Sequence, residues 1–126
     1  MRFMMIVKAT ARSEAGVMPT PEQIAAMGAY NDQLVKAGVL VDLSGLKPTS
    51  AGAKVRFAGG QPVLSRGPFP AMSDVVSGFW IIDVASADEA FAWAMKAPNP
   101  AFSDTEGEIE VRPFFEPADF APAAQP

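Results

Sequence analysis

The sequence predicts an α+β fold of the ferredoxin-like kind, in which one antiparallel sheet carries two helices on a single face. Three observations predict this fold. Apolar strand-like segments alternate with two segments of helical periodicity, and each helical segment opens with residues that cap a helix. The chain has 126 residues, which suits one domain. The expected order is strand, helix, strand, hairpin, strand, helix and strand.

Four segments predict the strands of the main sheet. Residues 2–8 are apolar almost without interruption, which is typical of a strand covered on both faces. Residues 39–46 and 75–84 predict two further strands, and residues 108–115 alternate charged with apolar side chains in the manner of a last strand. Residues 9–19 are small and polar, and we expect a loop there.

The first helix is expected between Thr20 and Gly38. Thr20 and Gln23 can cap each other's backbone N–H groups, and Pro21 suits the first helical position. Gly38 is typical of a residue just past a helix end. The periodicity places six residues on the core face: Ile24, Met27, Gly28, Asn31, Leu34 and Val35.

The second helix is expected to begin at a capping box formed by Ser86 and Glu89 and to stop at Pro98. Its expected core face is Ala87, Ala90, Phe91 and Ala94. From Glu116 onward proline and alanine dominate, so we expect one domain over residues 1–120 and a flexible tail over 121–126.

A hairpin is expected over residues 54–65, because the Gly59–Gly60 pair accommodates the positive φ angles of a tight turn. Pro62 indicates an edge position for its second arm. Residues 66–70 contain two prolines and predict a rigid turn.

Two helices can cover only one face of the sheet, yet the segments 1–7 and 75–84 are apolar on both of their faces. An uncovered apolar sheet face would be a large adhesive patch. The simplest cover is a second copy of the same sheet, so we expect a homodimer that packs through its sheet faces.

Composition excludes several kinds of chemistry. Cysteine and histidine are both absent, which excludes disulfides, thiolate metal sites and cysteine nucleophiles and removes the usual general base. We therefore expect no metal and no cofactor. The net charge of −4, without a cluster of Lys or Arg, argues against nucleic acid as a partner. No apolar run approaches the length of a membrane span, and the first residues lack the pattern of a signal peptide, so we expect no membrane partner and a cytoplasmic location.

Six segments, spread from Met1 to the region before Phe120, form a specific combination. They are MRFMM at 1–5, YNDQLVKAGVL at 30–40, GPF at 67–69, GFWII at 78–82, SADEAFAW at 86–93 and EIEVRP at 108–113. Together they resemble the DGPF-domain branch of the YCII-related family. The resemblance implies a dimeric α+β barrel but little about activity, because most of that family has no assigned reaction.

The chain also departs from this family's pattern. Arg66 stands where the motif usually begins with Asp, and residues 71–74 replace a frequent Glu-Thr-Lys run. Better-studied YCII relatives are suspected of using a His–Asp pair. Because histidine is absent here, that mechanism cannot be carried over.

Several polar residues are candidates for a site. Asn31 lies on the apolar face of the first helix, where its amide either bonds neighbouring backbone or points into a pocket between helix and sheet. Glu110 and Arg112 share one face of the last strand, either as an exposed ion pair or facing a dimer cavity.

A cavity between the sheet and the rigid turn 66–70 is the expected ligand site. Its expected lining includes Arg66, Phe69, Trp80 and Tyr30, with Gly78 leaving room for the ligand; the alternative is that Phe69 simply fills the core.

Two functions remain open from the sequence. The first is a dimeric module that binds a small organic ligand. The second is an enzyme of proton-transfer or isomerase-like chemistry, with Glu110 or Asp42 as a carboxylate base whose pKa burial would have to raise.

Overall fold

The computed structural model describes residues 1–70, 74–102 and 106–120. The elements in chain order are β1 (Arg2–Lys8), α1 (Ala11–Glu14), α2 (Pro21–Lys36), β2 (Leu40–Gly45), the 3₁₀ turn η1 (Thr49–Ala51), β3 (Ala53–Ala58), β4 (Gln61–Arg66), β5 (Val76–Asp83), α3 (Ala87–Met95), β6 (Ile109–Pro113) and the 3₁₀ turn η3 (Pro117–Phe120). The predicted tail 121–126 and residues 71–73 of the departure from the family motif lie outside the described residues.

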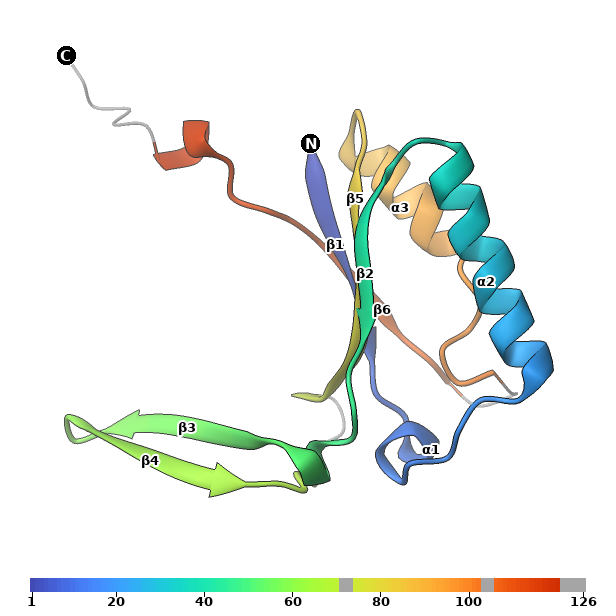
Figure 1. The fold of residues 1–126 in the computed structure, drawn as a ribbon. Coiled ribbons are helices and arrows are strands. Elements are labelled where there is room, and N and C mark those ends of the chain that lie inside the picture. Colours follow the sequence, from blue (N-terminus) through green and yellow to red (C-terminus); the bar gives the residue numbers. More distant parts are fainter. Residues whose placement is uncertain (71–73, 103–105, 121–126) are drawn as a thin grey trace, which may run out of the picture.

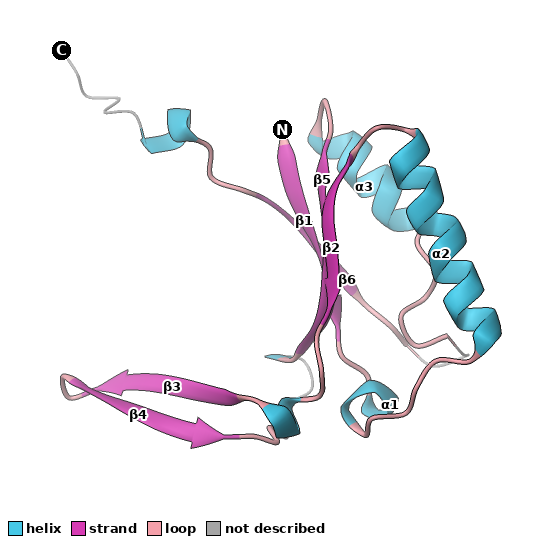
Figure 2. Cartoon of the chain, in the orientation of Figure 1, coloured by secondary structure: helices cyan, strands magenta, loops and turns pink. Residues whose placement is uncertain are grey.

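The main sheet has four antiparallel strands in the order β2-β5-β1-β6. The two long helices, α2 and α3, lie together on one side of it (Figure 1). β3 and β4 form a separate two-stranded sheet that projects from the opposite side (Figure 2). The predicted ferredoxin-like α+β plan is therefore confirmed, with the hairpin as a separate arm.

The core lies between the sheet and the helices. β1 and β5 pair so that Phe3 is opposite Ile82 and Met5 is opposite Trp80, and all four side chains are buried. Leu34 of α2 completes the packing. Because strand side chains alternate between faces, these residues fix which face of each strand meets the helices.

The buried face of α2 agrees only in part with the predicted one. Leu34 is buried and Met27 packs against the core as predicted. Tyr30 is also buried, whereas the side chains of Ile24 and Val35 are 57% and 60% exposed. The helix is thus rotated toward the side that carries Tyr30. A large aromatic side chain buries more apolar surface than an aliphatic one, so Tyr30 has the greater influence on the orientation of the helix.

Three local predictions are also corrected. The expected loop at 9–19 contains the one-turn helix α1, whose capping box joins Thr10 and Ser13. Phe91, assigned to the core face of α3, is 47% exposed. The Glu89 side chain accepts a hydrogen bond from the backbone of Ala85, so the box expected with Ser86 is only half formed.

In the part of the chain that the structure describes, no helix lies on the other face of the main sheet (Figure 1). By strand alternation its centre consists of four apolar residues, each half-buried: Met4, Ile6, Phe79 and Ile81. We call this surface the open face. The hairpin projects from the same side at one end of the sheet, and the segment after β6 projects at the other end (Figure 1).

The hairpin arm is amphipathic. Its turn residues Gly59 and Gly60 have φ of 60° and 78°, as the sequence predicts. Cross-strand partners share a face, so Val55 and Leu64 lie on an apolar face that continues through Phe57, which is 82% exposed. The opposite face carries Lys54, Arg56 and their cross-strand partners Ser65 and Val63.

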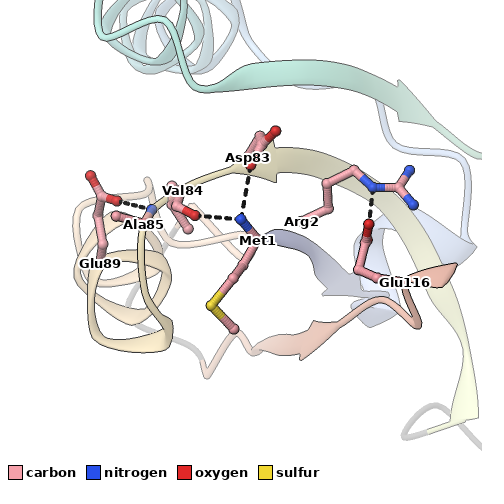
Figure 3. Close-up of polar contacts among 7 residues, drawn as sticks. All are labelled: Met1, Arg2, Asp83, Val84, Ala85, Glu89 and Glu116. Carbon is pink, nitrogen blue, oxygen red and sulfur yellow. Dashed lines mark hydrogen bonds and ion pairs between the residues drawn. The ribbon is translucent and has the colours of Figure 1, made fainter. Parts of the chain in front are cut away.

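Polar contacts connect neighbouring segments at the end of the main sheet farthest from the hairpin (Figure 3). The Met1 amino group donates to the Val84 carbonyl at 2.7 Å and pairs with Asp83 at 3.1 Å. The Arg2 guanidinium donates to Glu116 at 3.0 Å. These contacts join the start of β1 to the end of β5 and to the segment that follows β6.

Candidate ligand pocket

A pocket of about 610 Å³ lies on the helix side of the sheet, at the end nearest α1. This volume is within the range of small-molecule sites. Its walls come from α1, the loop 16–19, α2, the ends of β1, β2 and β5, and residues 100–102. Most of the lining is apolar, notably Val17, Met18, Met27, Leu46 and Phe102.

One polar side chain in this lining has a defined orientation. The Trp80 indole N–H donates to the Asn31 side-chain oxygen at 2.8 Å. The indole nitrogen can only donate, so the oxygen of Asn31 must face it and the amide NH₂ group must face the other way. That nitrogen makes no hydrogen bond to a described residue, and it is not fully buried, since each fully buried polar side-chain atom in the described part of the chain has a partner.

The Tyr30 ring packs against the Trp80 ring. The two rings meet edge to face, with centroids 5.3 Å apart and an interplanar angle of 79°. The Tyr30 hydroxyl donates to the Trp93 carbonyl of α3 at 2.7 Å. A series of contacts thus runs from α3 through Tyr30 and Trp80 to Asn31. Such contacts reduce the freedom of the Asn31 amide before any ligand arrives.

The charged residues of the lining are all cationic. Arg12 and Lys47 line the pocket, and neither makes an ion pair with a described residue. Among the lining residues that the structure describes there is no Asp or Glu, although acidic residues outnumber basic ones by 14 to 10 in the whole chain. Thr10, Ser13 and Gln23 also line the pocket, but the hydroxyls of Thr10 and Ser13 and the amide oxygen of Gln23 are engaged in capping α1 and α2.

The sequence matches the YCII-related domain family over residues 1–116. The chain belongs to the YCII-related family. It is also 36% identical over 87 residues to "Uncharacterized protein R00369" of Rhizobium meliloti (strain 1021), a match that covers 69% of this chain and 68% of the relative.

The structure of this YCII-related protein brings together only some of the site residues expected from the sequence. Asn31 and Trp80 line the pocket and are hydrogen-bonded, so the partner of Asn31 is a side chain, not neighbouring backbone. Tyr30 lies behind Trp80, with its hydroxyl engaged by α3. The volume expected beside Gly78 is occupied in part by protein, because a Cβ placed there would lie 2.8 Å from the Ser44 carbonyl oxygen.

Arg66 and Phe69 lie outside this pocket, at the base of the hairpin. The Phe69 backbone N–H donates to the Thr49 hydroxyl at 3.1 Å, and the Lys54 ammonium lies 4.4 Å from the centre of the Phe69 ring. The rigid turn therefore packs against η1 and not over β5. Phe69 does not fill the core either, since it is absent from the main hydrophobic cluster.

The three remaining candidates lie on the open face. Strand alternation places Glu110 and Arg112 on that side of β6, opposite Ile6 and Met4, and Asp42 at the far edge on β2. Glu110 pairs with Lys8 at 3.0 Å and lies 3.8 Å from Arg112. Asp42 accepts a hydrogen bond from the backbone of Leu43 at 2.8 Å. None of the three lines the pocket.

Sequence reasoning missed the wall that α1 supplies. The signal was present in Thr10 and Ser13, three residues apart, but a capping pair before only one helical turn is weak. It also missed Phe102, whose φ of 52° is uncommon for an aromatic residue and is of the kind that occurs at binding sites.

Two kinds of feature are absent from the described ranges 1–70, 74–102 and 106–120. No group of three or more acidic side chains there could hold a metal ion. No helix there combines the length and apolarity needed to cross a membrane.

Burial raises the pKa of the Tyr30 hydroxyl to about 12. The unfolded group titrates near 10, so the native state favours the neutral phenol. The contribution of this pKa shift to folding stability is complete below pH 10 and is lost as the pH rises through 12.

Tyr30 is the only tyrosine in the sequence, so the near-ultraviolet absorbance of tyrosinate reports on it alone. We expect a midpoint near 12 for native protein and near 10 in denaturant. A Tyr30→Phe variant should lose this part of the pH dependence, and a native midpoint near 10 would contradict the burial.

Proposed function

We propose that this YCII-related protein is a dimeric module that binds a small organic ligand in the pocket lined by α1, α2 and the ends of β1, β2 and β5. The observation that carries the proposal is the Asn31 amide, whose oxygen is held by Trp80 and whose nitrogen is left to donate. A pocket with mostly apolar walls and a few oriented polar groups is the usual form of a small-molecule site. The Gly67–Pro68–Phe69 turn at the hairpin base supports placement in the DGPF branch of the family.

Binding is favoured over catalysis by where the carboxylates lie. Glu110 and Asp42, the two bases that an isomerase-like reaction would use, are on the opposite side of the sheet from the pocket. Glu110 is engaged by Lys8. A general base must reach the proton that it removes, and neither carboxylate reaches a ligand held beside Asn31.

The dimer is supported by the open face and by the hairpin arm. The apolar residues at the centre of the open face are half-buried and have no described helix over them, and the arm exposes apolar side chains such as Phe57. The arm, residues 53–66, has three basic residues and no acidic one, so the rest of the chain carries a charge of −7. In a dimer packed through the open faces, the cationic arm of each copy would lie against the acidic body of the other.

Tryptophan fluorescence can test the proposal. A Trp93→Phe background leaves Trp80, in the pocket wall, as the only tryptophan. With 3-phenylpropanoate, 3-phenylpropanamide and 3-phenylpropanol as probes, we expect a saturable change in Trp80 emission and a higher melting temperature for at least one. Replacing Asn31 with Leu should weaken that binding about tenfold by removing the donor.

Matched controls separate the pocket from the rest of the surface. Gln33→Leu makes a similar change at an exposed position of α2 outside the pocket, and should leave the affinity unaltered. Glu110→Gln and Asp42→Asn should also leave it unaltered. The proposal fails if none of the three probes gives a saturable response, or if the two carboxylate variants abolish the response while Asn31→Leu does not.

A further inference from the structure

We propose that the ligand of this pocket is a small organic acid, with an apolar body and a carboxylate that meets Arg12 and Lys47. This inference rests on the proposed binding function and adds the chemical class of the ligand. It comes from the charge of the lining, which opposes the charge of the protein as a whole.

Acidic residues are common in the chain, which has 14 of them and 10 basic residues. Among the basic side chains, Arg2 and Lys8 each pair with a glutamate at 3.0 Å, and Arg112 lies 3.8 Å from Glu110. Arg12 and Lys47 have no such partner in the described chain and lie together on one pocket.

The acidic residue closest in sequence to Arg12 is engaged elsewhere. Glu14, also on α1, accepts hydrogen bonds from both the backbone N–H and the hydroxyl of Thr49, at 2.8 Å and 2.5 Å. These bonds hold both carboxylate oxygens of Glu14 at the hairpin base. Arg12 therefore remains available to an anion from solution.

The geometry of the lining selects a particular kind of anion. A guanidinium group binds a carboxylate through two parallel hydrogen bonds, and a lysine ammonium adds a second positive charge. The apolar walls formed by residues such as Val17, Met27 and Leu46 require an apolar body of matching size. The free Asn31 donor can bind a further oxygen of the ligand.

A comparison of isosteric probes tests the class of ligand. Calorimetric titration of the protein with 3-phenylpropanoate and with 3-phenylpropanamide should show at least tenfold tighter binding of the acid. The preference should shrink as salt is added, because exposed cations are screened. An Arg12→Gln, Lys47→Gln double variant should bind acid and amide almost equally. The matched double variant Lys54→Gln, Arg56→Gln, on the hairpin, should keep the preference.

The possible failures are distinguishable. If acid and amide bind equally well to the parent protein, the acid preference is overturned while the binding function stands. If phenyl phosphate binds tighter than 3-phenylpropanoate, the pocket is a phosphate site and the carboxylate assignment is overturned. If the hairpin variant loses the preference and the Arg12, Lys47 variant keeps it, the cations of this pocket are not responsible. If no probe binds, the proposed function itself fails.

Discussion

Replacing Ile81 with Asp is expected to convert the proposed dimer to a monomer. Ile81 lies at the centre of the open face, opposite Met4 on β1 and Asp42 on β2. In a dimer with two-fold symmetry each substitution occurs twice, so two carboxylates would lose their hydration in the same interface. Desolvation of an unpaired charge costs several kcal/mol per ion, which is enough to dissociate a dimer at micromolar concentration.

The neighbouring residues offer no compensation for the new charge. Asp42 is the cross-strand partner of Ile81 on β2, so the second carboxylate would lie beside a like charge. Arg112 lies two strands away, opposite Met4. The substitution should also leave the monomer folded, because Ile81 faces away from the core that Trp80 and Ile82 form with the helices.

Sedimentation velocity of both proteins is the measurement. Ile24→Asp is the matched control, since the same chemical change is made at a position of α2 that is 57% exposed and lies outside the open face. We expect the control to remain a dimer. A parent protein that sediments as a monomer at micromolar concentration would contradict the dimer, and a dimeric Ile81→Asp variant would place the interface on another surface.

Much of the fold is predictable from the sequence because local signals agree with the tertiary arrangement. Thr20 and Gln23 cap α2 as the sequence indicates, and Gly38 adopts φ of 72° just past the end of that helix. The Gly59–Gly60 turn fixes the register of the hairpin. Each of these features depends on residues close in sequence, and the physics of caps and turns is local.

Local signals do not predict which face of α2 is buried. Its sequence offers two overlapping apolar stripes that share Leu34, one with Ile24 and Val35 and one with Tyr30. The second stripe is buried because Tyr30 meets Trp80 of β5, 50 residues farther on, and the carbonyl of Trp93 on α3. That choice is made by tertiary contacts, which a helical period does not contain.

The candidate site likewise contains residues that the sequence predicts and residues that only the tertiary structure brings in. Asn31 stood out as an amide on an apolar helix face, and Trp80 as an aromatic on a central strand, so both could be proposed from sequence. Arg12 and Lys47 had no such signal, because each is an ordinary charged residue beside a short element. Only the fold brings them to one pocket. Arg66 and Phe69 were proposed from a rigid turn, but rigidity does not reveal which surface a turn packs against.

The turn at the hairpin base leads to a second large expected effect. A Cβ placed on Gly67 would overlap the carbonyl of Thr49, which is backbone and cannot rotate away. The Gly67 N–H donates to the Gly52 carbonyl at 2.9 Å, so the two segments are held at this close approach. Overpacking at such a contact costs about 2–3 kcal/mol.

We expect Gly67→Ala to release the hairpin locally and to leave the main sheet intact. The hairpin shares no strand pairing with the main sheet, so the overlap can be relieved by detaching the arm from η1. A cost of about 2–3 kcal/mol corresponds to a roughly 30- to 150-fold rise in the open population. Limited trypsin cleavage after Lys54 and Arg56 should accelerate by that factor, while the melting temperature of the core changes much less.

Gly28→Ala is the matched control, because a Cβ there meets nothing within 4 Å and the residue lies inside α2. The control should stabilise the helix by up to about 1 kcal/mol and leave hairpin cleavage unchanged. Equal cleavage rates in Gly67→Ala and the parent would show that the arm is not held against Thr49 in solution.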